Sequence, residues 1–193
     1  MRKIIFAIFI LGTVSSYSQE KNKFIYLHLS DKSVSLTPFY KPFGASMDPA
    51  ITLGGGINYF QNLHSSIFQV IQGTWYSAKM IGGGITLSSS MGYQYRSTTG
   101  IYAEFALGIA GTGFISGRET FILDENGQYG QETPLHWTLG VPIDLGLGYQ
   151  FAKYSVYCKY RYMLEGTYAD ILPILPSSLV SLGFKYSISR AED

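Results

Sequence analysis

The sequence WTLGVPIDLGLGYQF occupies residues 137–151 and alternates without a break. Every odd position holds an apolar or aromatic side chain, and no even position holds a large apolar one. Because successive side chains of a β-strand point to opposite faces, this pattern predicts one long strand with an apolar face and a small or polar face. Pro142 and three glycines argue against a helix over the same residues.

The same segment is long enough to cross a membrane. A tilted strand needs about 9–11 residues to span a bilayer, and residues 137–151 exceed that length. Trp137 lies at one end of the apolar face, and Tyr149 and Phe151 lie at the other, which is where membrane barrels carry aromatic girdles. We therefore predict a lipid-facing strand of a transmembrane barrel.

The rest of the chain repeats this alternation. The segments that alternate are predicted to be strands, and they cover residues 23–30, 50–60, 65–76, 83–95, 101–112, 137–151, 154–165 and 178–188. They predict an all-β fold, an eight-stranded antiparallel up-and-down transmembrane β-barrel. The facing of residues 65–76 stays open, because both faces of that segment carry large apolar side chains.

The connections between these segments differ in length. Membrane barrels have short periplasmic turns and longer external loops, so the long connections 31–49, 113–136 and 166–177 are predicted to be external. The sequence DENG at residues 124–127 is typical of a hairpin tip, which predicts that connection 113–136 continues as a ribbon above the membrane. An external ligand, if there is one, is expected at these three loops.

The first residues predict export. Arg2 and Lys3 precede a short apolar run, and Ser16-Tyr17-Ser18 supplies small residues before Gln19, as at signal-peptidase sites. We expect a signal peptide at residues 1–18, a barrel domain at residues 19–193 and an integral protein of the cell outer membrane after cleavage. The formal net charge is +1 and no basic run is present, so no nucleic-acid partner is expected.

Charged side chains on the polar faces are predicted to lie inside the barrel; they are Glu104, Asp144, Lys159, Arg161 and Lys185. If residues 152–153 form a tight turn, Asp144 falls directly opposite Arg161. Buried charges must pair or cost several kcal/mol each, so we predict an ion pair between these two side chains, with Glu104 and Lys159 nearby. The interior of an eight-stranded barrel is just wide enough for side chains to fill, which favours a plug over a selectivity filter or a proton site.

His28 and Ser30 are the strongest candidates for catalysis. Their spacing on one strand resembles that of some outer-membrane lipid A deacylases, although no acidic third member can be assigned. Unchanged lipid A after alanine replacement of both residues would remove this alternative. No histidine, cysteine or carboxylate spacing suits a metal, and the acidic residues between 119 and 132 fit a solvated loop better than a Ca²⁺ site. We expect no catalytic residue, no metal and no cofactor.

From Gln19 to about Ile188 the chain resembles the small outer-membrane β-barrel proteins of Gram-negative bacteria. The resemblance is carried by the sequence SYSQ at residues 16–19, the alternating strands and the closing segment LGFKYSI at residues 182–188. It implies outer-membrane lipid and lipopolysaccharide as the surroundings of the protein, and insertion by the barrel-assembly machinery.

These features together predict a non-enzymatic outer-membrane barrel with a plugged interior. Its external loops would bind a surface partner or support envelope integrity. A lipid-modifying enzyme of the outer leaflet and a narrow pore are the functional alternatives, and a pore would conduct in planar bilayers. A soluble lipocalin-like barrel is the structural rival, and it would place the apolar face inside and the charges outside.

Overall fold

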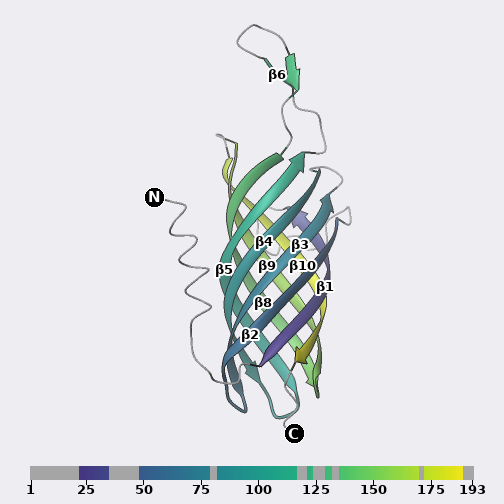
Figure 1. The fold of residues 1–193 in the computed structure, drawn as a ribbon, viewed down its shortest axis with the longest axis vertical. Coiled ribbons are helices and arrows are strands. Elements are labelled where there is room, and N and C mark those ends of the chain that lie inside the picture. Colours follow the sequence, from purple (N-terminus) through teal and green to yellow (C-terminus); the bar gives the residue numbers. More distant parts are fainter. Residues whose placement is uncertain are drawn as a thin grey trace.

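The computed structural model describes residues 22–34, 48–78, 82–116, 121–123, 129–131, 135–169 and 172–188. The barrel strands are β1 (Lys23–Val34), β2 (Pro49–Gln61), β3 (Ser65–Ala78), β4 (Gly82–Arg96), β5 (Ile101–Ser116), β8 (Leu135–Phe151), β9 (Tyr154–Ala169) and β10 (Leu172–Ile188). Each strand pairs antiparallel with its neighbours along the chain, and β1 closes the barrel against β10 (Figure 1). The predicted eight-stranded up-and-down barrel is confirmed. No helix among the described residues is long and apolar enough to cross a membrane.

Side chains alternate between the lumen and the outer surface. In β8, Leu139 is 74% exposed, whereas Asp144 is 1% exposed. The same contrast holds around the barrel, where Ile, Leu, Phe, Tyr and Trp side chains form the outer surface and most charged and hydroxyl side chains of the strands lie inside. An apolar exterior of this extent suits contact with lipid, and it excludes the lipocalin-like arrangement.

The outward face of β3, which the sequence leaves open, carries Ile71 and Trp75. Ile71 is 63% exposed, whereas Phe68 and Tyr76 on the opposite face are each 2% exposed. Space for the inward rings comes from the neighbouring strand, because any side chain at Gly92 would collide with the ring of Phe68. The lumen beside β3 is therefore filled by aromatic side chains.

Arginine at position 71 tests this assignment. Ile71 lies midway along β3, so Ile71→Arg is expected to lower the free energy of unfolding by about 2–4 kcal/mol, the cost of arginine near the bilayer midplane. Ser77→Arg makes the same kind of change on the same face near the end of the strand, where about 0–1 kcal/mol is expected. Urea unfolding of protein refolded in lipid vesicles measures both values. Equal losses would contradict a lipid-facing position for Ile71.

The strands run further than the sequence predicts, so the external loops are shorter. β1 continues to Val34 and β5 to Ser116, which places parts of the predicted loops 31–49 and 113–136 in the barrel wall. The predicted loop 166–177 is wrong, because β9 extends to Ala169 and β10 begins at Leu172. Backbone pairing with a neighbouring strand extends these segments beyond the apolar alternation that marks them in the sequence.

Two prolines, Pro173 and Pro176, led to the prediction of a loop at 166–177. Their positions in the sheet explain why a strand tolerates them. Pro173 lies at a register shift between Leu172 and Ile174, where the ladder between β9 and β10 is interrupted. Pro176 lies beyond the end of β1, which pairs with β10 only as far as Ser177. Among the described residues, this part of β10 has a partner on one side only, and a missing N–H costs little at such an edge.

Connection 117–134 carries a two-stranded ribbon. β6 (Phe121–Leu123) pairs antiparallel with β7 (Tyr129–Gln131), and Figure 1 shows β6 beyond the end of the barrel. The predicted ribbon is confirmed, and its predicted tip, residues 124–127, lies outside the described residues. The predicted signal peptide, residues 1–18, also lies outside them.

Candidate functional site

The centre of the lumen holds an ion pair positioned by β8 and β9. These strands are joined by the tight turn 152–153, across which Phe151 pairs with Tyr154. The ladder that starts at this turn brings Asp144 opposite Arg161. Arg161 donates from Nε to Asp144 Oδ1 at 2.6 Å and from Nη2 to Oδ2 at 2.7 Å. This forked geometry is the strongest form of carboxylate recognition by arginine, and both side chains are buried.

A second carboxylate connects the two lysines to this pair. Glu104 of β5 lies 3.1 Å from Lys159 Nζ through Oε1 and 3.4 Å from Lys185 Nζ through Oε2. Lys159 Nζ also lies 3.9 Å from Asp144 Oδ2. The structure thus places all five charged side chains in the lumen and joins them in one network, with three cations and two carboxylates.

A glycine makes the link between β5 and β9 possible. Gly146 of β8 pairs with Glu104 on one side and with Lys159 on the other. A Cβ atom at Gly146 would stand 2.5 Å from Glu104 Cγ. Glu104 and Lys159 can therefore meet over Gly146, because this residue has no side chain to separate them.

Neutral groups complete the surroundings of the network. The amide of Gln72 lies between the Tyr26 hydroxyl and the Arg161 guanidinium, and with its oxygen toward the guanidinium it accepts from Arg161 and donates to Tyr26. Lys185 Nζ lies 4.9 Å from the ring centroid of Phe24 and 5.1 Å from that of Tyr102. Such ring faces attract cations, so they help to stabilise the ammonium group away from water.

A further ion pair, absent from the sequence-based prediction, joins β1 to β9. Lys32 Nζ lies 3.6 Å from Glu165 Oε1 and 3.5 Å from the ring centroid of Tyr76. The strand predicted from the sequence ends at Ser30, which places Lys32 in the predicted loop 31–49. The available signal was parity, because Lys32 continues the series of even-numbered inward positions that includes His28.

The structure gives His28 and Ser30 separate hydrogen-bond partners. His28 is 2% exposed, and its Nε2 is hydrogen-bonded to the Tyr157 hydroxyl. Ser30 Oγ instead lies 2.7 Å from Ser181 Oγ. A nucleophilic serine needs its hydroxyl within hydrogen-bond reach of the base, and the acyl chains of a lipid would meet the outer face of the barrel rather than the lumen.

No metal site is found in the part of the chain that the structure describes: no group of three histidine, cysteine, aspartate or glutamate side chains there could hold an ion. The acidic residues of the predicted external loop, at positions 119, 124, 125 and 132, lie outside the described residues.

Comparison with known proteins identifies the architecture. No protein-family model matches the sequence, and no curated protein matches it. Solved structures do match: Neisserial surface protein A (NspA) has a TM-score of 0.56 at 12% identity, with 89% of this chain and 99% of that chain covered. The chain has the fold of the eight-stranded outer-membrane β-barrels. The resemblance seen in the sequence is thus confirmed for the architecture.

Among other solved outer-membrane barrels with this fold, one is named as an enzyme. The outer membrane enzyme PagL has a TM-score of 0.54 at 16% identity, with 84% of this chain and 98% of that chain covered. The N-terminal β-barrel domain of Pseudomonas aeruginosa OprF has a TM-score of 0.51 at 14% identity, with 87% and 99% covered. The function of this outer-membrane-type barrel therefore has to be argued from its own side chains.

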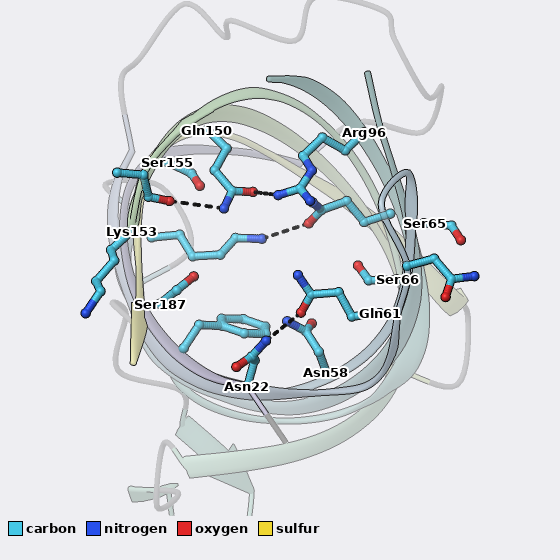
Figure 2. A pocket seen from close by; sticks show the side chains of 15 residues that line it. Asn22, Asn58, Gln61, Ser65, Ser66, Arg96, Gln150, Lys153, Ser155 and Ser187 are labelled. Carbon is cyan, nitrogen blue, oxygen red and sulfur yellow. Dashed lines mark hydrogen bonds between the residues drawn. The ribbon is translucent and has the colours of Figure 1, made fainter. Parts of the chain in front are cut away.

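This barrel also has a polar cavity at its short-turn end, the end that carries the turns 62–64, 97–100 and 152–153. The cavity is lined mainly by residues at the ends of the strands, with Asn62, Ala152 and Lys153 from the turns. The cavity has a volume of about 180 Å³ (Figure 2). Amide and serine side chains supply most of its lining, together with Phe24, Ala152 and three cationic residues. Lys185 belongs both to this lining and to the central network.

Proposed function

We propose that this protein is a non-enzymatic integral outer-membrane barrel that is closed to solutes and presents its long connections outside the cell. The connections would bind a surface partner or support envelope integrity. The observation that carries the proposal is the buried charge network across the lumen, combined with an apolar outer surface.

The network supports a plug rather than a pore. Glu104 and Asp144 each hold two cations, so a path for ions through this level of the lumen requires at least one paired charge to lose its partner. Breaking a buried pair costs about 3–5 kcal/mol, and the interior of an eight-stranded barrel is just wide enough for side chains to fill. Cross-strand threonine pairs add further contacts nearby, with Thr52 Oγ1 2.8 Å from Thr74 Oγ1.

The non-enzymatic part of the proposal rests on the partners of His28 and Ser30. Each is hydrogen-bonded to a different side chain, and His28 is buried in the lumen. PagL, named as an outer membrane enzyme, shares the fold, so the fold by itself supports neither an enzyme nor a binding protein.

The apolar exterior and the external connections suggest which molecules this protein would contact. Outer-membrane lipid and lipopolysaccharide would contact the apolar exterior, and insertion would require the barrel-assembly machinery. An external ligand would be bound by connections 31–49 and 113–136. The third predicted loop contributes little, since residues 166–177 lie almost entirely in β9 and β10.

The purified protein is expected to produce no single-channel conductance steps in planar bilayers, because the charge network fills the lumen. Heat-modifiable gel migration of the same preparation, and of the outer-membrane fraction of expressing cells, is the control that a closed barrel is present. Stable conductance steps from heat-modifiable protein would contradict the closed lumen and favour the narrow pore. Recovery of the protein in the soluble fraction would contradict the membrane assignment.

A further inference from the structure

The cavity at the short-turn end has an excess of positive charge. Its lining includes Arg96, Lys153 and Lys185 and no carboxylate. Lys185 shares its only carboxylate partner among the described residues, Glu104, with Lys159. The central network contains three cations and two carboxylates, so it has one positive charge without a counter-charge. This charge adds to the positive charges at the rim of the cavity.

Arg96 is held in place without being neutralised. Its Nη1 donates to Gln150 Oε1 at 2.9 Å, and its Nη2 donates to the backbone oxygen of Leu63 at 3.3 Å. Both acceptors are neutral, and no carboxylate in the described ranges forms an ion pair with Arg96. Figure 2 shows Arg96 and Gln150 joined at the rim of the cavity. The guanidinium is thus oriented by the protein and keeps its charge available.

The rest of the lining can recognise amide groups. Gln94, Gln150 and Asn58 carry side chains that both donate and accept hydrogen bonds, and serines such as Ser66 and Ser155 do the same. A peptide group needs one donor and one acceptor, which such a wall provides. The volume of about 180 Å³ is below the usual 300–1,000 Å³ of drug-sized pockets, so it suits a small ligand.

We propose that this cavity binds a carboxylate, either a small free carboxylate anion or the C-terminus of a short peptide. The planar fork of Arg96 matches the two oxygens of a carboxylate, and one such group balances one unneutralised guanidinium. The amide-rich wall would hold the peptide groups that precede it. The site lies at the short-turn end, opposite the external connections, so it is separate from the proposed surface binding and does not require an open lumen.

The test is a titration of the protein, refolded in detergent micelles at low ionic strength, with N-acetyl-alanyl-alanine. Amide ¹H–¹⁵N shifts of the cavity residues are expected to move and saturate, and the C-terminal amide of the same dipeptide is expected to bind at least tenfold more weakly. Acetate distinguishes the two sources of carboxylate. Equal affinity for acetate and the dipeptide would assign the site to a free anion, and tighter binding of the dipeptide would assign it to a peptide terminus.

Two charge-matched variants locate the site. Arg96→Gln is expected to weaken dipeptide binding at least tenfold, and Arg96→Lys, which keeps the charge but not the fork, is expected to have an intermediate effect. Lys23→Gln removes the same charge from an exposed side chain at the same end of the barrel that is not part of the cavity lining, and it is expected to change affinity less than twofold. Heat-modifiable migration checks that each variant folds. Absence of saturable shifts, equal binding of the C-terminal amide, or equal losses in the two glutamine variants would overturn the proposal.

Discussion

Replacement of Asp144 by alanine is expected to lower the free energy of unfolding by about 3–5 kcal/mol, because it leaves Arg161 buried without its main counter-charge. The remaining carboxylate, Glu104, is already engaged by both Lys159 and Lys185. Urea unfolding of the protein refolded in lipid vesicles measures the loss.

The double variant Asp144→Leu with Arg161→Met separates the cost of an unpaired charge from the value of the pair. Apolar side chains of similar volume often replace a buried ion pair at little or no loss, so most of the stability is expected to return. Asp31→Ala is the matched single control: its carboxylate is half-buried and accepts one backbone N–H, from Asp48 at 2.9 Å, which predicts a loss of about 1 kcal/mol. Equal losses for Asp144→Ala and Asp31→Ala would contradict a central role for the ion pair.

The Gly108→Val substitution is expected to be at least as damaging as Asp144→Ala. It should lower the free energy of unfolding by more than ~4 kcal/mol, which is exceptional for a single substitution. Gly108 of β5 is paired with Ser90 of β4, and a Cβ atom there would overlap the backbone oxygen of Ser89 and the Oγ of Ser90. Overpacking is usually relieved by side-chain movement, but here the main obstacle is backbone. β4 is also held on its other side by β3 and cannot move away without opening the barrel.

Gly111 gives a control in the same strand. It faces outward, and a Cβ atom at this position would meet nothing within 4 Å. Gly111→Val is therefore expected to change the free energy of unfolding by less than about 0.5 kcal/mol, since surface substitutions of this kind have small effects. The folded fraction of each variant is read from heat-modifiable migration, and its stability from urea unfolding. Wild-type stability of Gly108→Val would show that β4 and β5 can separate locally.

Alternation along the chain was sufficient to predict the barrel and five of the charged side chains in its lumen. A strand has a side-chain period of two, so the sequence around Leu139 and Asp144 already separates the outward from the inward face. The same parity places Glu104, Lys159 and Lys185 inside. These assignments depend only on residues that are neighbours in the chain.

The register of β8 and β9 was also accessible from the sequence. A two-residue turn fixes which residues of a hairpin face each other, and counting from residues 152–153 leads to Asp144 and Arg161. No comparable count leads from Glu104 to Lys185, because their strands β5 and β10 are not neighbours in the sheet. Their contact exists because the closed barrel brings opposite walls within side-chain reach.

Local patterns determined which side chains of most strands face lipid and which face the lumen, because the backbone imposes that alternation wherever a strand forms. Tertiary structure alone decided the facing of β3, the lengths of β1, β9 and β10 and the cavity at the short-turn end. The facing of β3 depends on the space left at Gly92 of β4, and strand length depends on whether a neighbour supplies backbone partners. The cavity depends on side chains from several turns and strand ends that converge only when the barrel closes, as Arg96 and Gln150 do.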